Sequence, residues 1–400
     1  MSHAKYGIII ILSYLLSLSI LLSGCDTSTA NSTSHNVVES MTIQARTIAY
    51  SSGHSMFIDN NNSLFAWGGN WYGQLGDGTT TDRYYLVHIM DNVVSVSTLD
   101  SHTMAIQTDG SLWGWGHNDI GQIGDGSRQN RYSPVHIMDD VIDVFTGTWS
   151  SFAIRSDGSL WGWGLNNFGQ VGNRTTRDQH RPVHIMNDVV SVSSYGHTTM
   201  AIQSDGSLWA WGIIDFSRLG EGTFRGQPYP MHIMDNVAYV SVGNGHAAVV
   251  KTDNDLWTWG LNFHGQLGDG TLEYRPYPIH IMNDVASVVS GAGNTWAIKT
   301  DGSLWAWGSN DSSRLGNSTT EEKALSPIHI MDDVVAIADG VGSALALQSN
   351  GSLWVWGRLL YPLLFETGEA QEASHMEGNS HIPPITVLEP TKIANNVMLP

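Results

Sequence analysis

The chain has 400 residues, long enough for two or three ordinary domains, although large all-β proteins reach this size as one unit. Its 18 Lys and Arg residues stand against 37 Asp and Glu residues, which gives a formal net charge of −19. Binding to nucleic-acid backbones requires clustered cations, and the sequence has no run of Lys or Arg. The composition therefore argues against nucleic acid as a partner.

Residues 1–24 have the pattern of an export signal. Lys5 is followed by an almost unbroken apolar run from Ile8 to Leu22, which is short for a spanning helix of about 20 residues. The next residues, Leu22-Ser23-Gly24-Cys25, resemble the bacterial lipobox, in which the Cys is lipidated and becomes the new N-terminus. The sequence therefore predicts a lipoprotein signal peptide with lipidation at Cys25; the alternative is an uncleaved membrane anchor.

Cys25 is the only cysteine, so the chain cannot form an intramolecular disulfide. Residues 25–44 are rich in Ser, Thr and Asn, which is typical of a flexible tether. We expect the protein in the cell envelope, held by its lipid at the outer leaflet of the cytoplasmic membrane. An outer membrane is the alternative, although Asp26 resembles an inner-membrane retention signal of some two-membrane bacteria.

Residues 45–400 repeat one unit seven times. A Trp-Gly pair recurs with a spacing of 48 residues five times and then 49. Its Trp residues are Trp67, Trp115, Trp163, Trp211, Trp259, Trp307 and Trp356. A His-Ile-Met motif keeps the same period and begins at His88, His136, His184, His232, His280 and His329, with a degraded copy at Lys392-Ile393-Ala394.

Each unit predicts four short strands, such as those around Val93, Thr103, Ser111 and Pro134. Asp-Gly between the second and third predicts a two-residue hairpin turn. Four antiparallel strands at this period are typical of a propeller blade.

Several segments resemble the repeat of the RCC1 (regulator of chromosome condensation) family: Gly245 to Val250, Asp157 to Gly172, and Gly265-Gln266-Leu267-Gly268. The resemblance covers about residues 45–400 and implies an all-β, seven-bladed β-propeller closed by joining the two chain ends. Either Val37-Val38 or the segment to Val397 could supply the closing strand. The founding activity of the family, nucleotide exchange on a nuclear GTPase, does not suit an exported chain. Exported bacterial relatives include β-lactamase inhibitory proteins, so the resemblance implies protein binding or inhibition.

The seventh unit is atypical, because an insertion at about 358–390 replaces the Gly-Gln-Leu-Gly segment. We expect its Leu-Leu-Tyr-Pro-Leu-Leu-Phe portion to cap the seam between first and last blades, and the remainder to form a mobile loop.

Residue types kept in every copy serve what every blade needs, so we interpret the Trp-x-Trp-Gly column as packing between blades rather than as stacking sites. The six His of His-Ile-Met could bind a metal only by converging in the central channel. We instead expect ordinary strand positions, and hence no metal and no cofactor. No catalytic motif occurs, and we expect no enzyme activity.

Aromatic residues that break the repeat are the candidate partner-binding residues. In an up-and-down blade, the first-to-second and third-to-fourth connections share one face, and these residues are expected there. Between first and second strands they are Trp149, Tyr195 and Trp296. After third strands they are Trp71, Tyr72, Phe168 and Phe216, with Phe263 and His264 at the matching place of another copy.

Exposed aromatics on loops over a rigid scaffold are typical of protein-binding surfaces. The sequence therefore predicts a monomeric, non-enzymatic propeller that binds a protein through this face. The opposite, acidic face carries the second-to-third turns and the links between blades; we call it the turn face and expect it nearer the membrane. The alternatives are a module or hydrolase that acts on wall polysaccharide, a purely structural envelope protein, and aromatic side chains that only fill loop interiors.

Overall fold

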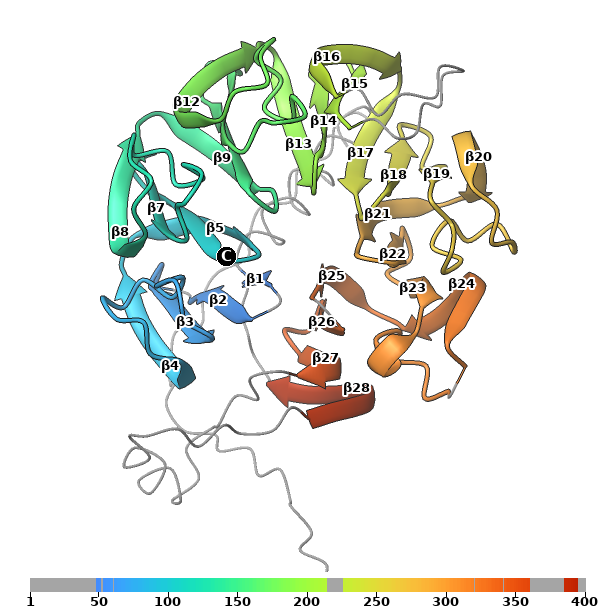
Figure 1. Cartoon of the computed structure of the whole chain (residues 1–400). Helices are drawn as coiled ribbons and strands as arrows, with labels where there is room; N and C mark the ends of the chain where they lie inside the picture. Colours follow the sequence, from blue (N-terminus) through green and yellow to red (C-terminus); the bar gives the residue numbers. More distant parts are fainter. Residues whose placement is uncertain are drawn as a thin grey trace, which may run out of the picture.

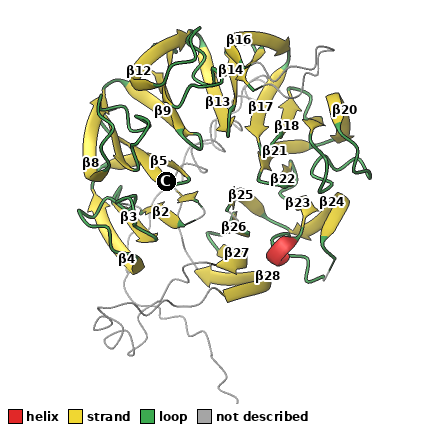
Figure 2. Ribbon diagram, viewed as in Figure 1, coloured by secondary structure: helices red, strands yellow, loops and turns green. Residues whose placement is uncertain are grey.

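The computed structural model describes residues 48–51, 53–59, 61–213, 226–319, 321–340, 342–359 and 385–394. Seven four-stranded antiparallel sheets stand around a common axis as the blades of a propeller (Figure 1), which confirms the predicted fold class. Blades 1 to 7 follow one another in chain order. Between them the described residues include only one short helix, the 3-10 turn η1 (Asp311–Ser313) (Figure 2). No helix in this part of the chain is long and apolar enough to cross a membrane.

Each blade runs outward from the axis, strand by strand. The innermost strands are β1 (Ile48–Tyr50), β5 (Val93–Leu99), β9 (Val141–Thr146), β13 (Val189–Tyr195), β17 (Val237–Val242), β21 (Val285–Ser290) and β25 (Val334–Asp339). The second strands are β2 (His54–Ile58), β6 (His102–Gln107), β10 (Ser150–Arg155), β14 (Thr198–Gln203), β18 (His246–Lys251), β22 (Asn294–Lys299) and β26 (Ser343–Gln348).

The third and fourth strands complete each blade. The third strands are β3 (Leu64–Gly68), β7 (Leu112–Gly116), β11 (Leu160–Gly164), β15 (Leu208–Gly212), β19 (Leu256–Gly260), β23 (Leu304–Ser309) and β27 (Leu353–Leu359). The outermost strands are β4 (Arg83–Met90), β8 (Arg131–Met138), β12 (Gln179–Met186), β16 (Gln227–Met234), β20 (Arg275–Met282), β24 (Lys323–Met331) and β28 (Ile385–Ala394).

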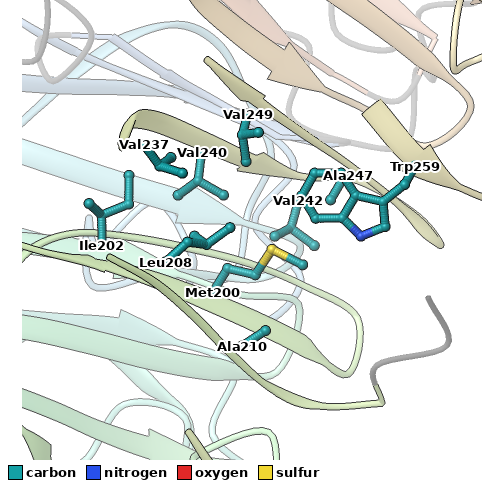
Figure 3. Close-up of a cluster of buried hydrophobic side chains, with 10 residues drawn as sticks. All are labelled: Met200, Ile202, Leu208, Ala210, Val237, Val240, Val242, Ala247, Val249 and Trp259. Atoms are coloured by element: carbon teal, nitrogen blue, oxygen red, sulfur yellow. The ribbon is translucent and has the colours of Figure 1, made fainter. Parts of the chain in front are cut away.

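The hydrophobic core lies between neighbouring blades. Five consecutive residues of a second strand such as β6 are buried, because a blade packs on each of its faces. Figure 3 shows one such layer, in which Met200 and Leu208 of blade 4 pack with Val240, Val242 and Trp259 of blade 5. The repeat therefore specifies the same apolar contact at successive blade interfaces.

The Asp-Gly connections have three residues rather than the predicted two. The amide of Gln107 donates to the carbonyl of Ser111, so Thr108, Asp109 and Gly110 form the turn. Gly110 has φ +83° and Asp109 is not among the residues of positive φ, so only the glycine needs left-handed backbone. The prediction of a two-residue turn was wrong because the turn includes one more residue, Thr108, before the Asp-Gly pair.

Among the residues that the structure describes, blades 1 and 7 share no strand. Blade 1 takes all its strands from the N-terminal end, and blade 7 takes all four from the C-terminal end. Val37, Val38 and Val397 lie outside the described residues. Trp67 at this seam is only partly buried, whereas its counterparts in the other blades are buried. The described parts of blades 7 and 1 meet by packing, with β25 next to β1.

The ends of the seventh-unit insertion extend the blade, since Leu359 pairs with Ile385 and Arg358 with Thr386. Lys392 pairs with Trp354 as His136 pairs with Trp113, so Lys392-Ile393-Ala394 is the equivalent of His-Ile-Met. Apart from Leu359, the Leu-Leu-Tyr-Pro-Leu-Leu-Phe portion and the expected loop up to residue 384 lie outside the described residues.

Candidate interface on the loop face

In five blades the second Trp of the Trp-x-Trp-Gly motif joins its blade to the preceding one. Nε1 of Trp115 donates to the carbonyl of Gln74 at 2.9 Å, and the Thr103 hydroxyl donates to the same carbonyl at 3.0 Å. A Cβ on Gly76 would lie 2.7 Å from Trp115 Nε1, so only glycine allows this approach. The same indole contact recurs from Trp163 to Gln122, Trp211 to Gln170, Trp307 to Gln266 and Trp356 to Arg314. These Trp residues are scaffold, as predicted.

The first Trp of the motif serves its own blade. Nε1 of Trp113 donates to the Ser111 hydroxyl, which donates in turn to the carboxylate of Asp109. These Ser111 hydrogen bonds lower the pKa of Asp109. The chain of contacts explains the recurrent Asp-Gly-Ser-Leu-Trp sequence.

The His-Ile-Met histidines lie on outermost strands of separate blades and do not converge at the axis. His136 packs edge-on against Trp113, and its Nε2 lies 2.8 Å from Oδ1 of Asp139. Equivalent contacts to the residue three positions on occur at His88, His184, His232 and His329. Each ring therefore already has a partner in its own blade.

A buried Asn in the third-to-fourth connection organises the loop, a role that the sequence reasoning missed. Oδ1 of Asn70 accepts from the amide of Leu75, and its Nδ2 donates to Asp77 Oδ1 and the Thr79 carbonyl. The signal was an Asn two residues after Trp-Gly in five of the seven copies, and the same role falls to Asn118, Asn166, Asn262 and Asn310. These loops are therefore pinned rather than irregular.

The two classes of connection share one face, as predicted; we call it the loop face. Phe168, in a third-to-fourth connection, packs 4.7 Å from His197, in a first-to-second connection. Trp149 lies in the first-to-second connection of blade 3, and its ring centroid is 5.8 Å from that of His197. Burial lowers the pKa of His197, so this ring favours its neutral form within the cluster.

The loop face bears exposed aromatic side chains. Trp71 is 73% exposed, Phe263 is 63% exposed and Tyr72 is 38% exposed. The ring centroid of Tyr72 lies 4.4 Å from that of His117. Trp149 and Phe168 are partly buried, so they offer less surface. Phe216 lies outside the described residues. The prediction of an aromatic face therefore rests mainly on Trp71, Tyr72 and Phe263.

The placement of Trp296 was wrong. It lies inside β22 at 0% exposure, and its register places it where blade 2 has Met104 and blade 3 has Phe152. Alignment of Asn-Thr-Trp-Ala-Ile-Lys with His-Thr-Met-Ala-Ile-Gln would have revealed this position. Trp296 packs edge-on against Trp356 and belongs to the core.

Tyr195 ends β13 instead of lying in the connection, and it packs on the core between blades 4 and 5. Burial raises the pKa of its hydroxyl, and the carboxylates of Asp339 and Asp100 raise it further, whereas Arg314 lowers it. These groups belong to blades 7, 2 and 6. The Tyr195 hydroxyl therefore lies within electrostatic reach of side chains from across the ring.

Comparison with known proteins agrees with this architecture. The family model described as RCC1-like domain matches residues 22–293, and that of the regulator of chromosome condensation (RCC1) repeat matches residues 301–347. A search of curated protein sequences returned no match.

Solved structures show the same fold at low sequence identity. Human WBSCR16 is similar with a TM-score of 0.67 at 20% identity, over 76% of this chain and 86% of that chain. Prp20p from Saccharomyces cerevisiae, in a structure whose report concerns its binding to Gsp1p and histones, has a TM-score of 0.67 at 20% identity, over 85% of this chain and 88% of that chain. Yeast RCC1 (Prp20), bound to Kap60, has a TM-score of 0.70 at 18% identity, over 96% of this chain and 92% of that chain. With a family model matched over more than half of its length, the chain belongs to the RCC1-like domain family.

Proposed function

We propose that this protein is a non-enzymatic, lipid-anchored propeller of the cell envelope that binds a protein partner through its loop face. The observation that carries the proposal is the exposure of Trp71 and Phe263 on loops that a rigid scaffold holds in place. Large aromatic side chains dominate the binding energy of protein interfaces, because they bury much apolar area with few rotatable bonds.

The loop of Trp71 is preorganised for binding. The amide of Asn70 donates to Asp82 Oδ1 at 2.8 Å, and the amide of Tyr72 donates to Gln74 Oε1 at 2.9 Å. The residues on both sides of Trp71 are therefore held, and docking would order little additional backbone.

Phe263 is held in an equivalent way. Asn262 Oδ1 accepts from the Leu267 amide, and the His264 amide donates to Gln266 Oε1 at 2.9 Å. Two matching loops thus present different aromatic side chains on the same face.

The solved relatives support a protein partner by analogy. The reports of their structures name Kap60 as bound to yeast RCC1, and Gsp1p and histones as proteins that Prp20p binds. The identities of the partners do not transfer to this chain, and the protein-binding use of the fold supports the proposal as an analogy, beside the exposed aromatic side chains.

The anchoring part of the proposal rests on the sequence of residues 1–44. β1, the innermost strand of blade 1, begins at Ile48 and ends at Tyr50, where the first connection of the loop face follows. β1 therefore starts at the turn face of the propeller. In the proposed arrangement the turn face lies nearer the membrane and the loop face points away from it.

Site-specific photocrosslinking on living cells tests the proposal. A benzophenone side chain introduced at Trp71 or Phe263 is expected to capture a discrete protein, whereas the same group at Asp253 on the turn face is not. Capture only from Asp253, or saturable binding of the purified propeller to a wall glycan without protein capture, would refute a protein-binding loop face. Protease cleavage on intact cells tests the orientation, since preferential cleavage of the turn face would contradict it.

A further inference from the structure

At four blade interfaces in the described part of the chain, one carbonyl oxygen accepts two hydrogen bonds from the following blade. Nε1 of Trp163 and the hydroxyl of Ser151 both donate to the carbonyl of Gln122, at 2.9 and 2.8 Å. An indole and a hydroxyl meet in the same way on the carbonyls of Gln74, Gln170 and Gln266. Each of these carbonyls is followed by a buried Leu, Ile or Val and then by a glycine that packs on the same indole.

Blade 1 presents the same two donors at the seam, the interface of blades 7 and 1. Ser55 pairs with Trp67 across β2 and β3 as Ser151 pairs with Trp163 across β10 and β11. Neither Trp67 Nε1 nor Ser55 Oγ donates a hydrogen bond to any residue that the structure describes, although Ser55 is only 3% exposed. Neither atom is sealed from solvent, so an acceptor can reach both. Two donors in this arrangement indicate a place for a carbonyl oxygen.

Blade 7 lacks the sequence that supplies the carbonyl at the other interfaces. No Gly-Gln-Leu-Gly segment follows Trp356-Gly357, and β27 continues instead, so that Arg358 pairs with Thr386. Val355 in this strand is 6% exposed, whereas its counterpart Ala66 in blade 1 is fully buried. The described residues at the seam are therefore less covered than those at the interface of blades 1 and 2.

Apolar side chains adjoin the two free donors. Phe57 and Val355 stand where the interface of blades 1 and 2 has two alanines packed around buried Leu75. Both are larger than alanine, so they leave room for a smaller side chain than Leu. Val171 fills the equivalent place between blades 3 and 4 and is fully buried. We call the following residues the seam site: Ser55, Phe57, Trp67 and Val355.

We propose that the seam site binds a segment of the partner protein in which Val, or an apolar residue of similar size, is followed by glycine. The carbonyl before the apolar residue accepts from Trp67 Nε1 and Ser55 Oγ, and the glycine lies on the indole, as the chain's own segments do at other interfaces. This inference rests on the proposed function and specifies its chemistry. Trp67 precedes the connection that carries Trp71, so one partner on the loop face can contact both.

The indole N–H signal of Trp67, observed by NMR in the full chain with isotope-labelled tryptophan and assigned with Trp67→Phe, tests the site directly. In the free protein this N–H should exchange with deuterated water faster than that of Trp115, which is buried and hydrogen-bonded. A peptide with the sequence of residues 166–174, Asn-Asn-Phe-Gly-Gln-Val-Gly-Asn-Arg, should shift the Trp67 signal saturably and slow its exchange. Equally slow exchange of Trp67 and Trp115 in the free protein would show that the chain itself fills the site, and would overturn the proposal.

Two altered peptides test the chemistry that is recognised. Gly172→Ala in the peptide should weaken binding about tenfold, because a Cβ on Gly172 would lie 2.6 Å from Nε1 of Trp211 in the chain's own interface. Val171→Ala should weaken binding about tenfold through the loss of buried apolar area. Equal binding of the three peptides would overturn recognition of an apolar residue followed by glycine.

Ser55→Ala and Trp67→Phe each remove one donor from the site. Each should weaken binding of the fluorescein-labelled peptide about fivefold, the effect of one lost hydrogen bond, as measured by fluorescence anisotropy. Trp113→Phe is the matched control, because it removes an indole donor whose acceptor Ser111 lies in its own blade; it should change the affinity less than about twofold. If Trp67→Phe does not fold, Ser55→Ala decides the question, and equal effects of Ser55→Ala and Trp113→Phe would overturn the site.

Photocrosslinking from Trp71 separates this inference from the proposed function. Capture of a protein that is undiminished in the Ser55→Ala variant and in the Trp67→Phe variant would overturn the seam site as part of the interface and leave the proposed function standing. Absence of capture from Trp71 and Phe263, together with a saturable shift of the Trp67 signal by the peptide, would count against the proposed function and leave the binding chemistry of the seam site standing.

Discussion

The indole Nε1 of Trp296 donates a hydrogen bond to Oδ1 of Asp339, 3.1 Å away in the next blade. Other blades place Met, Phe, Ala or Leu at the position of Trp296, and none of these needs a hydrogen-bond acceptor. Asp339 supplies one where other blades have neutral residues. The two departures from the repeat are therefore a matched pair across the interface of blades 6 and 7.

Truncation of Trp296 is expected to destabilise the propeller without removing exposed binding surface. Trp296→Ala should lower the free energy of unfolding by about 3–5 kcal/mol, because it leaves a cavity between two blades. Urea denaturation measures this loss. Trp71→Ala is the control and should stay within about 0.5 kcal/mol of the parent protein, since its side chain is exposed. Equal losses in the two variants would contradict the core assignment of Trp296.

The exposed aromatics should matter for binding and not for stability. Once the partner is captured, Trp71→Ala and Phe263→Ala should each weaken its binding by about tenfold, the effect of losing an interface anchor, with an unchanged melting temperature. Tyr277→Ala is the matched control, because Tyr277 is 65% exposed but lies on outermost strand β20. An equal effect of Tyr277→Ala in binding titrations would refute a specific loop-face interface.

Two glycines of one loop separate backbone strain from steric contact. Gly76 has φ +84° and packs on Trp115, whereas Gly78 has φ +82° and its nearest neighbour would be 3.6 Å from an added Cβ. Gly78→Ala should cost about 1–2 kcal/mol through its left-handed backbone alone. Gly76→Ala should cost about 1–3 kcal/mol more, because the methyl group collides with the indole. Chemical denaturation of both variants measures the difference, and equal costs would argue against the interblade contact.

Buried histidines should make the propeller acid-sensitive above the range in which carboxylates titrate. Burial lowers the pKa of His54 and His102 from 6.5 to about 3, and that of His246 to about 4. Below pH 6.5 these histidines bind protons in the unfolded chain but stay neutral in the folded chain. The free energy of unfolding is therefore highest above this pH and falls as the pH drops toward 4. Thermal melts across this range should show a declining melting temperature.

The variant His246→Asn tests the cause, because Asn294 occupies the equivalent position of blade 6. It should flatten the decline between pH 6.5 and 4 relative to the parent. A pH profile with the same slope as that of the parent would show that His246 does not contribute.

Regular features of the chain could be predicted because seven copies repeat them. The second Trp of the motif recurs in every copy, and its role as packing is confirmed by contacts such as Trp115 with Gly76. Residues that depart from the repeat were harder to place. Trp296 was assigned to a connection because Trp is rare at its position among the copies, although its neighbours align with a strand. Tyr195 was misplaced by one residue at a strand end, where pairing with Thr198 extends the strand.

By itself, the sequence determined the number of blades, the order of strands and the face to which each connection belongs, since these follow from a local pattern repeated at constant spacing. Only the tertiary structure decided which irregular side chains are exposed and which of them meet. Trp296 and Asp339 are 43 residues apart in the chain, and the packing of blade 6 against blade 7 brings the indole Nε1 within 3.1 Å of the carboxylate Oδ1. Such contacts depend on how seven blades pack around a circle, which no single repeat encodes.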